Sequence, residues 1–234
     1  MSRFMVSTDH QVSNTCTLQF VKILPFLLIN LRTRELIIWD RKLVMRDIQR
    51  LLIELDRLKS VYRNAFLSDR SRNENSAEHS WHLGIALLAL REVMPLELNV
   101  DHAVRIALVH DICEIGAGDI SVYDPDREQI SNSERAYISQ LVDKHQGFAL
   151  DIQDLWCEYE EQRTLESRWV KVVDRLLPFL MNLATEGKTW RKLGITRDQV
   201  VEINSVIASE APEIYRWMEK EIEKAVGLGW LASS

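Results

Sequence analysis

The chain has 234 residues, which is enough for one domain with a well-filled core. Its residues are 46% hydrophobic and 27% charged, a balance that is typical of globular proteins and excludes general disorder. The 29 basic and 35 acidic residues give a net charge of -6 and form no basic stripe, so we expect no bulk nucleic-acid partner. Three cysteines without paired spacing favour a reducing cytoplasm over a disulfide framework.

The first 44 residues show no clear helical pattern. Their most apolar stretch, residues 18–29, is interrupted by Lys22 and Pro25 and is shorter than the roughly 20 apolar residues that a spanning helix needs. It also lacks the basic cluster and the cleavage site of a secretory signal. We therefore predict no membrane anchor, and we interpret residues 1–44 as an extension of uncertain order or as sequence translated upstream of a start at Met45.

From Met45 onward, apolar residues recur at three and four positions, which is the pattern of amphipathic helices. The predicted helices cover residues 45–58, 77–90 with Ser76 as the cap, 100–115, 131–144, 152–162, 165–185 with a candidate kink at Pro178, and 197–226 with a break near Pro212. Residues 60–75 lose the pattern and are predicted to form a mildly basic loop. Since no period-two alternation of useful length appears, we predict an all-α helical bundle over residues 45–234.

The densest polar cluster lies inside an apolar helical run. His110, Asp111 and Glu114 interrupt the apolar residues between 107 and 115. A helix that buries its apolar neighbours must bury these ionisable side chains in part, which is costly unless they are paired or bind a metal. The cluster therefore indicates a cation site. Because adjacent helical residues point about 100° apart, at least two more ligands must come from other elements.

Two other predicted helices supply candidates for those ligands. His79 and His82 lie one turn apart, and spacing alone does not choose between them. Asp174 lies among apolar neighbours on the long helix after residue 165 and is the natural fourth ligand. Glu114 follows His110 by one turn on nearly the same face, which suits a base acting on water beside the ion.

Taken in chain order, these motifs resemble the superfamily of HD-domain metal-dependent phosphohydrolases, whose pattern is His, then His-Asp, then Asp on successive helices. The segments that carry the resemblance are Glu74–Ser80, His110–Glu114 with Gly118–Ile120, Leu155–Trp156 and Val170–Arg175. They are most similar to the branch that contains the bacterial 5'-deoxynucleotidases and human HD domain-containing protein 2. The resemblance covers roughly residues 45–185, and it implies a helical bundle of the HD-domain type and a homodimer.

The resemblance also implies the metal ligands. By position, His79, His110, Asp111 and Asp174 bind one divalent ion, which selects His79 over His82. Two imidazoles and two carboxylates suit manganese, cobalt, magnesium or iron(II) rather than a sulfur-loving ion.

Three further residues receive roles from the resemblance. Glu114 matches the residue that activates the attacking water, and Asp119 matches the contact to the sugar 3'-hydroxyl. Arg63 falls where an arginine faces the substrate phosphate, with a shift of one residue in the loop that follows it. Asn64 stands where the bacterial members have a tryptophan packed on the deoxyribose, which leaves the sugar preference open.

These residues together predict a metal-dependent phosphomonoesterase. Its expected reaction is hydrolysis of nucleoside 5'-monophosphates, with deoxynucleotides preferred, to nucleoside and phosphate. Two alternatives stay open: a different small phosphorylated metabolite or alarmone nucleotide as substrate, and a catalytically silent metal-binding helical module. Retention of Glu114 beside the ligands argues against the silent module.

Overall fold

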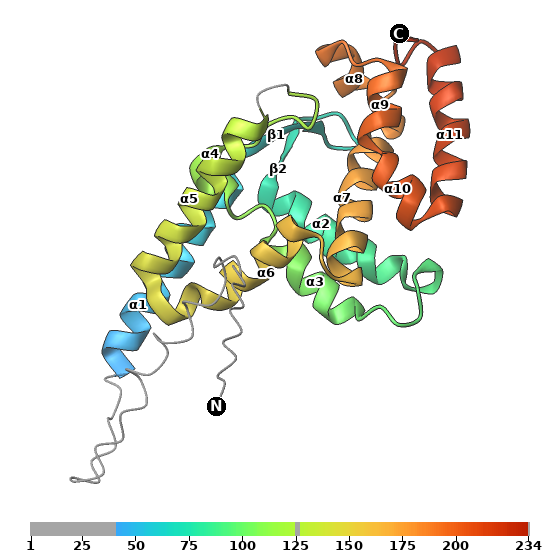
Figure 1. Cartoon of the computed structure of the whole chain (residues 1–234). Coiled ribbons are helices and arrows are strands. Elements are labelled where there is room, and N and C mark those ends of the chain that lie inside the picture. The colour runs from blue at the N-terminus through green and yellow to red at the C-terminus, as the bar shows by residue number, and fades with distance from the viewer. Residues whose placement is uncertain (1–40, 125–126, 234) are drawn as a thin grey trace, which may run out of the picture. The chain divides into compact units, whose positions relative to one another are not determined.

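The computed structural model describes residues 41–124 and 127–233 (Figure 1). Residues 1–40 lie outside this part, so the division of the chain at residue 44 stays a prediction. Within the described residues, no helix is both long enough and apolar enough to cross a bilayer.

The predicted all-α class is confirmed, with shifted helix ends. The helices are α1 (Arg41–Asp56), α2 (Ser76–Ala89), α3 (Val100–Val109), α4 (Glu114–Ala117), α5 (Arg127–His145), α6 (Leu150–Glu161), α7 (Leu165–Ala184), α8 (Lys188–Leu193), α9 (Arg197–Ile203), α10 (Ser205–Glu210) and α11 (Pro212–Gly227). The 3-10 turns are η2 (Arg57–Ser60), η3 (Arg91–Val93) and η4 (Gln146–Ala149), and the strands are β1 (Tyr62–Phe66) and β2 (Asn73–Asn75). Pro212 begins α11, where its missing amide hydrogen costs nothing.

The segment predicted to be a loop, residues 60–75, instead contains the antiparallel hairpin of β1 and β2. The strand β1 has more residues than the stretch of β2 that it pairs with, so it bulges. The side-chain amide of Asn73 holds the bulge, because its Nδ2 donates to the backbone carbonyls of Arg63 at 2.8 Å and Asn64 at 3.0 Å. The loop prediction was wrong because strands this short and polar show no alternation. The hairpin places Arg63 beside the start of α2.

The helix predicted over residues 100–115 is broken at its polar cluster. The helix α3 ends at Val109, His110 is its C-terminal cap, and α4 begins only at Glu114. In between, the amide of Glu114 donates to the carbonyl of Asp111 at 3.0 Å, a tighter turn than that of an α-helix. The sequence did not reveal this break because the spacing of apolar residues continues without interruption across it. His110 and Asp111 consequently lie in a stretch of 3-10-type turns between the two helices.

Two hydrophobic clusters fill the interior on either side of that turn. The larger one joins α2, α3, α7 and the C-terminal helices, and its fully buried members include Leu83, Leu87, Ala103, Ile106, Val170 and Val173. The smaller one joins α1, α4, α5 and α6, and includes Leu51, Ile112, Ile138, Leu141 and Trp156. Burying each of these large side chains is worth about 1.5–3 kcal/mol. Val109 packs against both clusters, so the turn that begins at His110 lies where they meet.

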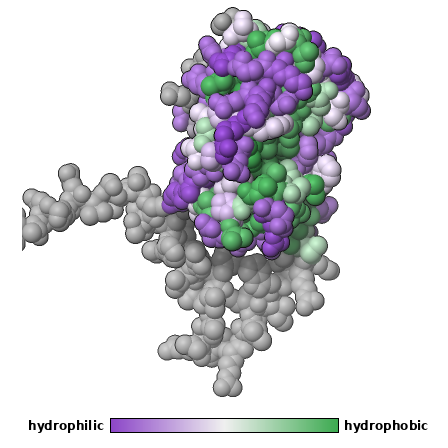
Figure 2. All heavy atoms as spheres, turned by 90° about the vertical axis from the view of Figure 1, so that its right-hand side faces the viewer, coloured by the Kyte–Doolittle hydropathy of each residue, from purple (hydrophilic) through white to green (hydrophobic). Residues whose placement is uncertain are grey.

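The surface carries an apolar groove. It lies between η3, α7 and α11 and is lined by residues that include Val93, Leu180 and Trp217. Val93 and Trp217 remain 61% and 41% exposed. Hydrophobic side chains gather in a strip on the face shown in Figure 2, which looks towards α11. Contiguous exposed apolar surface of this kind marks interaction sites.

Candidate metal centre

The helix α2 begins directly after β2 because Asn75 caps it. The Asn75 side chain accepts from the Glu78 amide at 2.9 Å, and the Glu78 carboxylate accepts from the Asn75 amide at 3.1 Å. The predicted cap, Ser76, was therefore wrong by one residue. Arg72 holds Glu78 with two hydrogen bonds of 2.6 and 2.8 Å. This cap fixes the first turn of α2, on which His79 is fully buried.

The orientation of the His110 ring is set by its own helix. Its Nδ1 lies 2.8 Å from the carbonyl oxygen of Ala107. A carbonyl only accepts, so in the neutral ring Nδ1 carries the hydrogen and Nε2 carries a lone pair. Nε2 is buried and makes no hydrogen bond to any described residue, although Asp111 Oδ1 lies 3.0 Å away outside hydrogen-bond geometry. A buried imidazole lone pair whose ring is held from the other nitrogen is the arrangement of a metal ligand.

The four residues predicted to bind metal converge. Ligand atoms of His79, His110 and Asp111 lie within 4.8 Å of one another. Asp174 Oδ1 lies 3.0 Å from His79 Nε2 and 3.8 Å from His110 Nε2. Around an octahedral ion with bonds of about 2.1 Å, neighbouring donor atoms are about 3 Å apart and opposite ones about 4 Å. These separations therefore fit one divalent ion. His82, the alternative ligand, is half-buried and lies outside the group.

Negative charge is in excess around this point. Arg63 Nη1 lies 2.6 Å from Asp111 Oδ2, 3.7 Å from Glu114 Oε1 and 3.8 Å from Asp119 Oδ1. The Arg63 Nε lies 4.0 Å from Glu74 Oε2, which in turn is 3.7 Å from His79 Nδ1. One guanidinium thus faces four carboxylates that are largely removed from water. A divalent cation would offset the remaining charge, and burial makes that gain large.

Asp119 reaches this cluster because of the glycine before it. Gly118 ends α4, its amide donates to the Glu114 carbonyl at 2.8 Å, and its φ is 79°. Residues with a side chain rarely adopt that conformation, which glycine adopts freely. The chain turns there and brings Asp119 beside Arg63.

The carboxyl groups of the site divide by their pKa values. Burial and the neighbouring Asp111 raise the pKa of Glu114 well above its usual range. Burial opposes ionisation of Asp111 and Asp174 too, but His110 and Arg63 hold the pKa of Asp111 below its usual range, and His79 and Lys171 hold that of Asp174 far below it. Asp111 and Asp174 therefore stay charged, as ligands must, and Glu114 has the affinity for a proton that a general base needs.

His79 titrates far from its ordinary range. Burial and Arg63 act to lower the pKa of His79, but the carboxylates of Asp174 and Glu74 outweigh them and raise that pKa to about 9. The metal-free centre therefore holds a proton on His79 at neutral pH, and a metal ion has to displace it.

The sequence analysis gave Tyr159 of α6 no role, yet it contacts two predicted ligands. Its hydroxyl donates to Asp174 Oδ2 at 2.8 Å, and its ring meets the His110 ring edge-on with centroids 5.1 Å apart. Burial and the neighbouring Asp174 raise the pKa of Tyr159 well above its usual value, so the hydroxyl keeps its proton. The only sequence signal was its spacing of four residues from the buried Leu155 on the inner face of α6.

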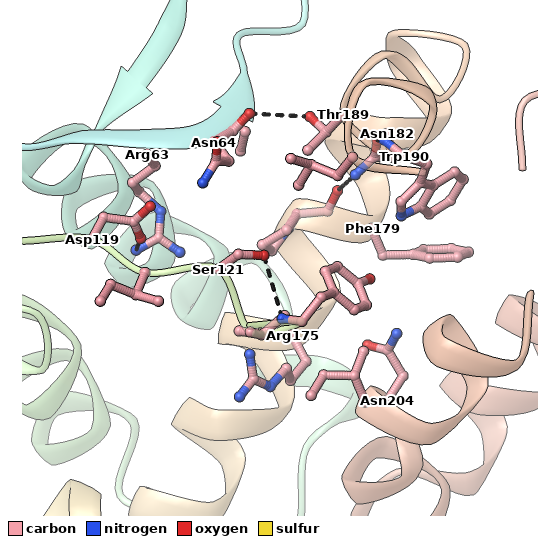
Figure 3. A pocket seen from close by; sticks show the side chains of 17 residues that line it. Arg63, Asn64, Asp119, Ser121, Arg175, Phe179, Asn182, Thr189, Trp190 and Asn204 are labelled. Atoms are coloured by element: carbon pink, nitrogen blue, oxygen red, sulfur yellow. Dashed lines mark hydrogen bonds and ion pairs between the residues drawn. The ribbon is translucent and has the colours of Figure 1, made fainter. Parts of the chain in front are cut away.

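A cavity adjoins the centre (Figure 3). Its volume is about 80 Å³, and it shares Arg63, Asp119 and Arg175 with the pocket that is lined by His110, Asp111 and Asp174. Its remaining lining is mostly uncharged, with polar and aromatic residues that include Asn64, Ser121, Tyr123, Phe179, Asn182, Thr189, Trp190 and Asn204. A ligand held by the ion and by Arg63 would extend into this cavity.

Asn204 gives this cavity an unused hydrogen-bond acceptor. Its Nδ2 donates to the Val200 carbonyl at 2.7 Å, which fixes the amide because a carbonyl only accepts. The Oδ1 atom is buried, and no described residue donates to it. A buried acceptor without a partner costs free energy until a ligand or a water satisfies it.

Comparisons with known proteins agree with this geometry. The model of the HD domain family matches residues 55–215. A protein from Magnetospirillum magnetotacticum MS-1, described as a predicted metal-dependent phosphohydrolase, has a crystal structure that superposes with a TM-score of 0.74 at 33% identity. That match covers 80% of this chain and 98% of the other.

Curated relatives match over shorter stretches. Human 5'-deoxynucleotidase HDDC2 is 33% identical over 119 residues, which are 49% of this chain and 53% of the human protein. The 5'-deoxynucleotidase YBR242W of Saccharomyces cerevisiae is 34% identical over 108 residues, 44% of either chain. The chain thus spans about half the length of the curated relatives it matches.

Proposed function

This chain belongs to the HD domain family, and we propose that it is a metal-dependent phosphohydrolase that converts nucleoside 5'-monophosphates to nucleoside and inorganic phosphate. The observation that carries the proposal is the convergence of His79, His110, Asp111 and Asp174 beside Glu114, whose pKa is raised. The nucleotide substrate, deoxynucleotides above all, draws support from the activity for which the human and yeast relatives are named.

The donor set suits a hard or borderline divalent ion, with manganese, cobalt, magnesium and iron(II) as the candidates. When bound, such an ion supplies Lewis acidity towards a phosphoryl oxygen and lowers the pKa of water. His79 and His110 supply the nitrogen ligands, and Asp111 and Asp174 the carboxylate oxygens.

Glu114 is the proposed base. It accepts a proton from the attacking water while the water oxygen bonds to phosphorus. The bond between phosphorus and the nucleoside 5'-oxygen breaks, that oxygen takes up a proton from solvent, and Glu114 returns its own proton to solvent, so the protons balance. The buried position and raised pKa of Glu114 favour its uptake of a proton.

Arg63 and Asp119 are the proposed substrate contacts. The Arg63 guanidinium, now bonded to Asp111, lies where it can also pair with equatorial phosphoryl oxygens, whose charge develops in the transition state. Asp119 lines both the metal pocket and the adjoining cavity, a position that suits an acceptor for the sugar 3'-hydroxyl. The base would then lie deeper in the cavity, towards Asn204 (Figure 3).

The test is phosphate release from the full chain. Chelator-stripped protein is reloaded with manganese, cobalt or magnesium and assayed against deoxy- and ribonucleoside 5'-monophosphates, matched 3'-monophosphates and small phosphate esters. We expect metal-dependent release from the 5'-monophosphates. Release from other esters alone would favour a different phosphorylated metabolite, and bound metal without any release would favour the silent binding module.

The homodimer implied by the family resemblance remains a proposal. The apolar groove that includes Trp217 is surface that a second copy would cover. Light scattering of the full chain measures the oligomeric state, and a monomer at micromolar concentration would contradict the proposal.

A further inference from the structure

The two carboxylate oxygens of Asp174 have different surroundings. Oδ1 faces the predicted metal position, 3.0 Å from His79 Nε2 and 3.8 Å from His110 Nε2. Oδ2 faces α6 instead, where it lies 2.8 Å from the Tyr159 hydroxyl and 3.6 Å from Lys171 Nζ. One oxygen is thus directed to the ion and the other to fixed hydrogen-bond donors.

The direction of these hydrogen bonds follows from the groups involved. Lys171 Nζ lies 2.7 Å from the Tyr159 oxygen, and an ammonium group only donates. The phenolic oxygen therefore accepts from Lys171, and its single hydrogen points to Asp174 Oδ2. With Tyr159 only 4% exposed, water does not compete well for this bond.

We propose that Tyr159 is a positioning residue for the metal centre, which engages Asp174 Oδ2 so that Asp174 offers only Oδ1 to the ion. This inference rests on the proposed metal-binding role of Asp174. A carboxylate binds a hard cation through one oxygen or through both. Donors on Oδ2 compete with the second mode and thereby favour one-oxygen binding, which leaves a coordination position for water or a phosphoryl oxygen. The edge of the Tyr159 ring against His110 fixes a second ligand at the same time.

The variant Tyr159→Phe tests the hydroxyl while keeping the ring beside His110. Loss of an outer partner of a ligand lowers metal affinity by about 10–100-fold, and we expect a loss in that range. Isothermal titration of manganese into chelator-stripped full-length protein measures it. The visible spectrum of the cobalt form provides a second readout, because a change from one-oxygen to two-oxygen binding alters the geometry around cobalt.

Tyr137→Phe is the matched control. Tyr137 is also buried, at 9% exposure, and its hydroxyl donates to Glu54 Oε1 at 3.4 Å in the smaller hydrophobic cluster. The same atom is removed, so a general effect of losing a buried hydroxyl appears in both variants. We expect Tyr137→Phe to keep the affinity and the cobalt spectrum of the parent. Lys171→Met keeps the tyrosine and should weaken metal binding by a smaller factor, which provides a second variant if Tyr159→Phe does not fold.

The outcomes separate this inference from the proposed function. If the parent binds manganese and both Tyr159→Phe and Lys171→Met bind it with unchanged affinity and spectrum, the positioning role is overturned and the proposed function stands. Equal losses in Tyr159→Phe and Tyr137→Phe would also overturn it, since they would show a structural effect. If the parent binds no divalent metal, the proposed function is wrong, and this inference is wrong too because it rests on metal binding by Asp174.

Discussion

The metal centre and the cavity beside it share Arg63, Asp119 and Arg175, yet they are built on different principles. In the centre, charged groups from α2, from the turn after α3 and from α7 are buried and held by one another or by a donor such as Tyr159. In the cavity, most lining groups are neutral, and Asn204 presents an acceptor that no described residue uses.

This difference separates chemistry from recognition. A charged centre whose side chains are each held in place by a neighbour can bind an ion and polarise a phosphoryl group, whatever group the phosphate is attached to. A neutral cavity with an unused acceptor instead binds a ligand more tightly when that ligand places a hydrogen-bond donor on the acceptor. This difference in affinity makes the cavity selective. Substitutions in the two regions should accordingly change different kinetic constants.

The largest effect is expected from His110→Ala. It removes a proposed ligand, and with it several kcal/mol of electrophilic assistance and the setting in which Glu114 is proposed to act, so turnover should fall by about 10⁴-fold. Phosphate release and manganese titration measure the two losses. His82→Ala, on the half-buried side of α2, is the control and should keep both. Normal turnover in His110→Ala would show that His110 is not a metal ligand.

Glu114→Gln sharpens the comparison inside the centre itself. The amide keeps the size of the side chain but cannot accept the proton from water, so kcat should fall by about 10²–10⁴-fold. Metal affinity and nucleotide KM should change little, because the loss belongs to the transition state. An equal loss in kcat and in nucleotide affinity would assign Glu114 to binding.

A residue of these sites could be predicted from the sequence when the pattern that identifies it lies within a few neighbouring residues of the chain. His79, His110, Asp111 and Asp174 each lie in a short motif, and the structure brings them together as the motifs predict. The break of the helix after Val109 was missed because its apolar spacing continues without interruption across the turn. Local patterns report which residues are buried, which was enough to propose His110, Asp111 and Asp174 as ligands, whereas the choice of His79 over His82 came from the family resemblance.

The residues that were missed depend on contacts between distant elements. Tyr159 is 15 positions from Asp174, and Asn204 lies at the junction of α9 and α10, which the prediction treated as one helix. Arg63 itself was predicted from the family resemblance, but the bulge held by Asn73 that sets its position was missed, because polar strands of this length do not reveal it. Apart from the spacing of four residues between Leu155 and Tyr159, these features have no periodicity to detect, so the folded chain is needed to show them.

A change of pH alters metal binding at the candidate centre without any substitution. In the metal-free protein the pKa of His79 is about 9, so its proton competes with the ion at every lower pH. The apparent manganese affinity should therefore fall by about tenfold per pH unit below 9, or about 100-fold from pH 8 to pH 6. Titrations in buffers of different ionisation enthalpy count the proton released. A pH-independent affinity would contradict the raised pKa.

The same proton affects stability in the opposite direction. The folded pKa of His79 lies above the unfolded value of about 6.5, so protonation stabilises the metal-free protein fully below pH 6.5. That contribution is lost as the pH rises from 6.5 through 9. Denaturant unfolding at the two ends of this range should show the loss in the parent and a smaller one in His79→Gln.

Asn204→Leu is the test on the side of the cavity, with the smallest expected effect. The change removes the unused acceptor and keeps a similar volume. If a nucleobase donor satisfies Oδ1, one hydrogen bond of about 0.5–1.5 kcal/mol is lost, and kcat/KM for nucleotides should fall by up to about tenfold. A small phosphate ester that reaches only the metal centre should be hydrolysed at the parent rate, and metal affinity should not change. Equal losses on both substrates would show that Asn204 supports the fold of the centre, and the division between chemistry and recognition would fail.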